Sequence, residues 1–108
     1  MTPQPKHGEV WLADLGLAGK TRPVVIVSRT DPDPPRALAI YVPITTQDRN
    51  SDYEVRIGHL RFLDDASVAN VQGIASLPLV RLVKRLGVLP ADDLARVKAA
   101  IQWSCELP

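Results

Sequence analysis

The sequence predicts a mainly β fold (α+β), in which five or six short strands form a small, strongly bent sheet or barrel and one C-terminal helix packs on it. The chain has 108 residues, enough for one compact core, so we expect a single domain over residues 1–108 with a flexible polar tail at 1–7. Ten prolines argue against an all-helical chain, because proline removes a backbone donor and breaks helix interiors. Several apolar runs, each of the length of a strand, occur between Gly8 and Val83, and one amphipathic helical pattern follows them.

Four segments have clear strand patterns. Residues 8–15 (GEVWLADL) place apolar side chains on both faces, and the β-branched run 23–27 (PVVIV) is typical of a strand buried on both sides. Residues 37–44 (ALAIYVPI) indicate another buried strand, after the turn-forming loop at 31–35. The alternation of polar and apolar residues at 53–57 (YEVRI) indicates a half-exposed strand.

Two further strands are expected from weaker patterns. One lies at 67–71 (SVANV), and the other lies within residues 74–83. Pro78 interrupts the second segment, and proline in a strand favours a bulge or a sheet edge. The sheet therefore has at least one irregular strand in its second half.

The last element, Pro90 to about Trp103, is predicted to be a helix. Proline is favoured in a first helical turn, and Asp92 and Asp93 complement the partial positive charge of a helix N-terminus. Apolar residues at three- and four-residue spacing form the inner face: Leu94, Val97 and Ile101. Basic residues are expected on the solvent side: Arg96 and Lys98.

Composition places few limits on function. Thirteen basic and twelve acidic residues make the chain nearly neutral, so a polyanionic partner would have to bind a local patch of positive charge. The single cysteine, Cys105, excludes an internal disulfide and a cysteine-rich zinc site. The N-terminus lacks an apolar signal region and no apolar run is long enough to span a bilayer, which predicts a cytoplasmic protein.

Familiar catalytic motifs are missing from the sequence. It contains no HExxH, P-loop or GxSxG motif. His7 and His59 could form an acid–base pair of the ribonuclease type, but they are far apart in sequence and surface histidines are the commoner case. Asp64 and Asp65 are typical of a solvated turn, and a Mg²⁺ site would need a further ligand. We therefore expect no metal and no cofactor.

Two short segments place polar side chains at strand ends. In residues 20–25 (KTRPVV), Pro23 restricts Arg22 to an extended backbone where a glycine-containing loop enters a buried strand. In residues 43–47 (PITTQ), a buried strand runs out into polar residues, and its two threonines point to opposite faces while the strand persists. Each segment alone is also compatible with an ordinary exposed arginine or with threonines that favour a strand.

Taken together and in this order, the motifs resemble the MazF/PemK toxin family. The resemblance covers nearly the whole chain from Gly8 and rests on four segments: GEVWLADL at 8–15, RPVVIVS at 22–28, PITTQ at 43–47 and the pattern RLGVLP…AI at 85–101. It implies an SH3-like barrel of five to seven strands with a C-terminal helix (CcdB/PemK-like). It also implies a symmetric homodimer, metal-independent cleavage of single-stranded RNA (mRNA, tRNA or rRNA) and inhibition by a cognate antitoxin.

By position, the catalytic arginine of the family falls on Arg22 and its catalytic threonine on Thr45. Neighbouring polar residues are then the RNA-binding residues: Lys20, Thr21, Thr46 and Gln47. The sequence departs from the family pattern in two places. The loop before Arg22 is shorter than usual, and Ala75-Ser76 stands where many members have an aspartate–glutamine pair.

The implied reaction is attack of a ribose 2′-hydroxyl on the adjacent phosphorus, which leaves a 2′,3′-cyclic phosphate and a 5′-hydroxyl. Arg22 suits the phosphate, because a guanidinium makes bidentate contacts to its oxygens, and Thr45 can donate a hydrogen bond. Arginine is a poor general base, so the sequence leaves the base unassigned. Two alternatives stay open: a non-catalytic barrel toxin that clamps a protein such as a DNA topoisomerase, and a degenerate nuclease that only binds RNA or antitoxin.

Overall fold

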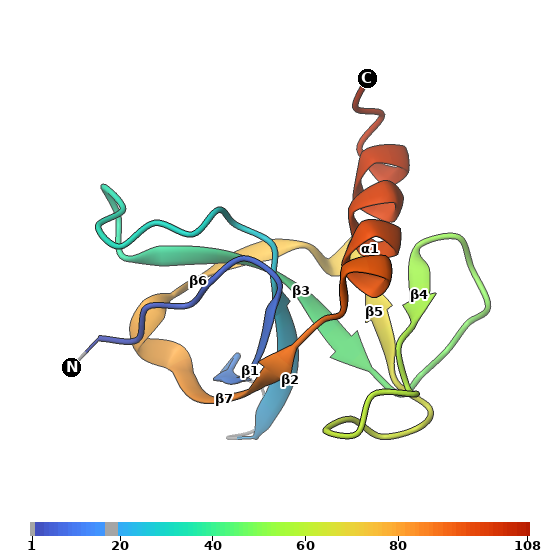
Figure 1. Ribbon diagram of the computed structural model, residues 1–108, viewed down its shortest axis with the longest axis horizontal. Coiled ribbons are helices and arrows are strands. Elements are labelled where there is room, and N and C mark those ends of the chain that lie inside the picture. Colours follow the sequence, from blue (N-terminus) through green and yellow to red (C-terminus); the bar gives the residue numbers. More distant parts are fainter. Residues whose placement is uncertain (1, 17–19) are drawn as a thin grey trace.

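The computed structural model describes residues 2–16 and 20–108, which form one bent antiparallel sheet and one C-terminal helix (Figure 1). The elements in chain order are β1 (Glu9–Asp14), β2 (Thr21–Ile26), β3 (Leu38–Thr45), β4 (Glu54–Arg56), β5 (Val68–Asn70), β6 (Ala75–Pro78), β7 (Leu82–Val88) and α1 (Ala91–Ser104). Short 3₁₀ turns at Val71–Gly73 and Leu79–Arg81 flank β6. Part of the predicted glycine loop, residues 17–19, lies outside the described residues.

The strand order in the sheet is β4-β5-β3-β2-β1-β7, and β6 pairs with β3. The first half of β3 pairs with β6 and its end pairs with β5, so β3 joins the two parts of the sheet. In the described part of the chain no pairing connects β7 to β4, so hydrogen bonds do not close the sheet into a full barrel. The predicted fold class, a bent sheet with a C-terminal helix, is confirmed.

The sheet is buried on both faces, as the β-branched run in β2 predicted. Val25 belongs to a core cluster that also contains Val97 of α1, whereas Val24 and Ile26 belong to a second cluster with Leu77 of β6. Alternate residues of a strand point to opposite faces, so one strand supplies both clusters. The helix therefore covers one face and the β6 region covers the other.

The helix follows the sequence prediction closely. It begins after Pro90, Val97 is fully buried, and Leu94 and Ile101 pack against the same cluster. Asp93 is also buried, which the pattern did not predict. Burial raises the pKa of the Asp93 carboxyl, but hydrogen bonds from Arg96 and His59 outweigh burial and hold the pKa below its ordinary value.

Two features of the chain were not predicted. β7 is a full strand, although only its first residues fall within the expected segment 74–83. Two register shifts against β1 disturb the alternation of its side chains, which explains why the sequence pattern is weak. In the N-terminal segment, His7 N–H donates to Thr30 Oγ1 at 2.9 Å and Lys6 N–H donates to Glu9 Oε1, so the end of the expected tail is held by β1 and by the loop that follows β2.

Candidate functional site

Arg22 and Thr45 line one groove of about 800 Å³. Strands β2 and β3 are antiparallel, and Val24 lies opposite Pro43. Extending this register by two residues places Arg22 opposite Thr45, and residues directly opposite each other on antiparallel strands present their side chains to the same face. The ends of the two strands therefore bring the predicted arginine and threonine to one site, although they are far apart in the sequence.

The Arg22 side chain is available to bind an anion. It is exposed, and its Nη1 donates one long hydrogen bond, 3.4 Å, to the carbonyl of Thr21. In the described part of the chain it makes no ion pair with a carboxylate. A guanidinium in this state keeps nearly all its donors for phosphate oxygens.

Thr45 and Thr46 both line the groove, although consecutive residues point to opposite faces for as long as a strand persists. The reason is that β3 ends at Thr45, and strand alternation no longer applies to the next residue. Thr45 Oγ1 accepts a hydrogen bond from the backbone N–H of Gln47 at 3.1 Å. This contact fixes the hydroxyl while leaving its hydrogen free to donate to a ligand.

The predicted RNA-binding residues are mostly at the same site. Thr21, Thr46 and Gln47 line the groove with Arg22 and Thr45. Lys20 is exposed but is not among the lining residues. Much of the remaining lining is apolar: Leu12, Leu15, Ile44, Phe62, Leu63 and Leu86. An anion bound between such walls would lose part of its contact with water, which strengthens its attraction to the guanidinium.

Sequence reasoning missed the loop between β4 and β5, which forms one wall of the groove. Asp64 of this loop is the only carboxylate residue that lines the groove in the described part of the chain. Its Oδ1 accepts the backbone N–H of Ala66 at 2.9 Å, so the turn predicted for this segment is correct. Two glycines could have indicated this wall in the sequence, because glycine permits the close approach of a neighbouring segment. Gly58 lies against the backbone of Asp65, and Gly87 lies against the ring of Phe62.

The two histidines lie outside this groove and bind different parts of the protein. His7 Nδ1 is 3.2 Å from the carbonyl oxygen of Val27, and His59 Nε2 is 3.1 Å from Asp93 Oδ1. The structure thus gives no support to a histidine pair at the Arg22 groove. Within residues 2–16 and 20–108, no three His, Cys, Asp or Glu side chains are grouped to hold a metal ion.

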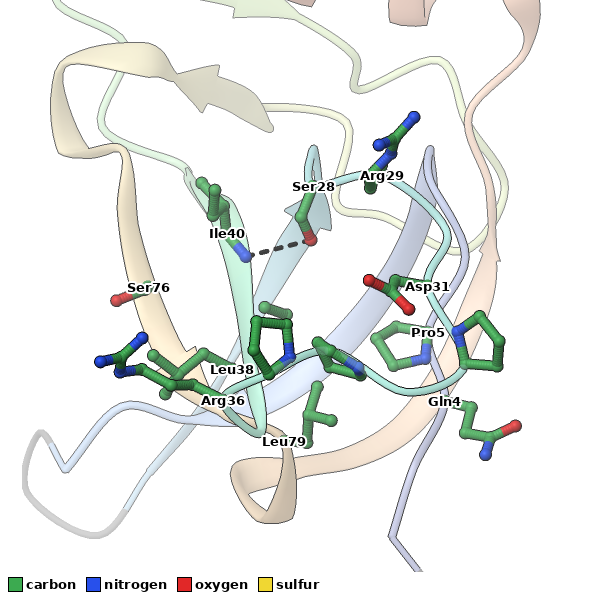
Figure 2. A pocket seen from close by; sticks show the side chains of 14 residues that line it. Gln4, Pro5, Ser28, Arg29, Asp31, Arg36, Leu38, Ile40, Ser76 and Leu79 are labelled. Carbon is green, nitrogen blue, oxygen red and sulfur yellow. Dashed lines mark hydrogen bonds between the residues drawn. The ribbon is translucent and has the colours of Figure 1, made fainter.

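A separate, largely apolar groove lies between the N-terminal segment, the loop at residues 31–35 and β3 (Figure 2). It is lined by Leu38, Ile40 and Ser76, and Ser28 Oγ accepts the backbone N–H of Ile40 at 3.1 Å. This groove shares no residue with the Arg22 groove. Ala75 and Ser76, which depart from the family pattern, are not among the residues that line the Arg22 groove.

Comparison with known proteins identifies the family. The sequence profile of the PemK-like, MazF-like toxins of type II toxin–antitoxin systems matches residues 6–105. The chain belongs to this toxin family. A probable endoribonuclease of Mycobacterium tuberculosis, MazF5, is 34% identical over 103 residues, which cover 94% of each chain. The resemblance read from the sequence motifs is thereby confirmed.

Solved structures of similar proteins confirm the fold of this MazF-like toxin. The Mycobacterium tuberculosis toxin MazF-mt6 is 27% identical with a TM-score of 0.81, covering 93% of this chain and 98% of its own. An endoribonuclease in complex with its cognate antitoxin, from a mycobacterial species, is 26% identical with a TM-score of 0.84, covering 96% and 97%. These relatives favour a nuclease over a toxin that clamps a protein target. In the described part of the toxin, no helix has the length and apolar character needed to cross a membrane.

Proposed function

We propose that this MazF-like toxin is a cytoplasmic, metal-independent endoribonuclease that cleaves single-stranded RNA, acting as one domain over residues 1–108. The observation that carries the proposal is the convergence of Arg22 and Thr45 from the ends of β2 and β3 in one groove. The family match and the related endoribonucleases support the same reaction class.

The groove supplies what cleavage by 2′-hydroxyl attack requires. Arg22 binds two oxygens of the scissile phosphate, and the Thr45 hydroxyl donates to a non-bridging oxygen as negative charge builds up on phosphorus. The 2′-oxygen bonds to phosphorus, the bond to the 5′-oxygen breaks, and the 5′-oxygen takes a proton from solvent water. Asp64 is the lining residue whose carboxylate can take the proton of the 2′-hydroxyl and return it to solvent.

Replacing Thr45 by alanine should lower the cleavage rate about 100-fold, because the loss of one well-placed donor costs that much in other enzymes. Thr45→Ser keeps the hydroxyl and should retain most of the activity. Initial rates on a labelled single-stranded RNA measure both effects. Thr46→Ala is the matched control: Thr46 lines the same groove without an assigned catalytic role, and we expect a smaller loss. Equal rates for Thr45→Ala and the unmodified protein would remove Thr45 from the mechanism.

The toxin is also proposed to form a two-fold symmetric homodimer. Several large apolar side chains are exposed: Leu38, Ile40, Val80, Val83, Val88, Trp103 and Leu107. Ile40 and Leu107 line one hollow beside α1, and an isologous interface would cover such a surface in both protomers. Light scattering at micromolar concentration should give the mass of a dimer, and Ile40→Glu should shift it toward the monomer. A monomer alone in the unmodified protein would contradict the proposal.

A cognate antitoxin is the proposed partner, as in the related mycobacterial complex. We expect a disordered acidic segment that folds over the Arg22 groove and competes with RNA. Further basic side chains of the toxin differ in their pairing. Arg56, Arg81 and Arg85 are paired with carboxylates, whereas Arg49, Arg61 and Lys84 have no ion pair in the described part of the toxin. Titrating antitoxin into toxin bound to an uncleavable RNA should release the RNA. A stable ternary complex with unchanged RNA affinity would show that inhibition acts elsewhere.

A further inference from the structure

A second, polar hollow of about 320 Å³ adjoins the Arg22 groove. Pro43, Thr45 and Gln47 line both hollows, so the two spaces meet at the end of β3. A ligand whose phosphate is bound by Arg22 and Thr45 can therefore place a neighbouring group in this hollow. Its volume is within the range of sites that hold small organic ligands.

Amide and guanidinium side chains supply most of the polar lining. Besides Gln47, the hollow is lined by Arg49, Asn70 and Gln72. Asn70 Oδ1 accepts the backbone N–H of Gln72 at 3.1 Å, which leaves the Asn70 amide nitrogen to donate. Asn, Gln and Arg are the side chains that read the edges of nucleobases through paired hydrogen bonds.

The walls of the hollow are fixed before any ligand binds. Glu54 accepts the backbone N–H of Arg49 at 3.1 Å and the hydroxyl of Ser51 at 2.8 Å, which ties down the loop that carries Arg49. On the other side, a Cβ on Gly73 would lie 2.7 Å from Pro43 Cγ, so the turn that carries Gln72 sits directly against β3. Walls held in this way need little ordering when a ligand enters.

The charge of the hollow favours an uncharged ligand. The hydrogen bonds from the Arg49 backbone and Ser51 hold the pKa of Glu54 below its ordinary value, so this carboxylate is ionised at neutral pH. It balances the positive charge of Arg49, and it would repel a second phosphate group. A nucleobase, which is neutral and has both donors and acceptors on its edge, fits this environment better than a phosphate.

We propose that this polar hollow binds one nucleobase of the RNA next to the cleaved phosphate and reads its edge through Arg49, Asn70 and Gln72. The inference rests on the proposed function, because it places the scissile phosphate at Arg22 and Thr45. Its consequence is a base preference at one position beside the cut that depends on the side chains of the hollow and not on the catalytic pair.

The experiment uses two randomised RNA pools and the double variant Arg49→Ala/Gln72→Ala. One pool has natural riboses, and its cleaved ends are sequenced. The other has 2′-O-methyl riboses, which cannot attack phosphorus, and its bound fraction is sequenced. We expect the unmodified toxin to prefer one base at a position beside the cut. In the double variant this preference should fall about 10-fold in both pools, which is the effect of losing one bidentate contact to a base. Arg36→Ala/Gln4→Ala is the matched control, because both residues line the separate apolar groove, and it should keep every preference.

The two pools separate this inference from the proposed function. If the unmodified toxin cleaves RNA and the double variant keeps the same preference at every position, the base site is wrong while the nuclease stands. If the toxin binds the 2′-O-methyl pool with a preference that the double variant loses, yet cleaves nothing, the base site stands and the catalytic proposal fails. Absence of any base preference in the bound and cleaved RNA would overturn the inference.

Discussion

Replacing Arg22 by alanine should abolish RNA cleavage and leave the fold intact. The guanidinium is the only cationic group that lines the groove in the described part of the toxin, and it provides at least two donors to the phosphate. The loss of each well-placed donor costs about 10²–10³-fold in rate, so the combined loss should reach the detection limit of an ordinary assay. Because Arg22 is exposed and makes one long hydrogen bond, the free energy of unfolding should change by less than about 0.5 kcal/mol.

Initial cleavage rates and urea unfolding of the same preparation measure the two effects. Arg22→Lys is a useful companion, since it keeps the charge but loses the bidentate geometry, and it should recover only a small part of the rate. Arg36→Ala is the matched control: Arg36 is an exposed arginine that lines the separate apolar groove, and its removal should leave cleavage unchanged. A folded Arg22→Ala protein with full activity would remove the proposed mechanism.

The largest loss of stability is expected from Gly58→Ala. A Cβ at this position would collide with the backbone carbonyl of Asp65, and a backbone group cannot turn aside as a flexible side chain can. Overpacking of this kind costs about 1–3 kcal/mol or more. The loop that forms one wall of the groove would have to move, so the cleavage rate should fall together with the free energy of unfolding.

Urea unfolding of Gly58→Ala tests this expectation, with Asp65→Ala as the matched control. The Asp65 residue is exposed, so removing its side chain leaves the backbone contact with Gly58 in place and should cost less than about 0.5 kcal/mol. Equal stability of Gly58→Ala and the unmodified toxin would mean that the loop is not held by this close approach.

The sequence predicted the parts of the fold in which local patterns act alone. The strands around Val24 and Val42 have the continuous apolar runs of a sheet buried on both faces, and α1 has one clear apolar stripe. β7 was missed because its register shifts against β1 break the alternation that marks a strand. The buried Asp93 was missed because its burial depends on Arg96 and His59, and His59 is distant in the sequence.

The candidate site was predicted only in part, for a similar reason. The motifs around Arg22 and Thr45 identify both residues, but only the register of β2 against β3 shows that they face one groove. Thr46 can join Thr45 in the groove because β3 ends at Thr45, and that end is not visible in a run of β-favouring residues. The wall that carries Asp64 was missed because long-range packing places it, through the close approaches of Gly58 and Gly87.

The central claim is that the toxin cleaves RNA through its own side chains without a metal ion. The most direct measurement incubates the purified protein with single-stranded RNA in excess EDTA and determines the chemistry of the new ends. We expect undiminished cleavage, with a 2′,3′-cyclic phosphate on one fragment and a 5′-hydroxyl on the other. Cleavage that EDTA abolishes, or new ends that carry a 5′-phosphate, would contradict the account.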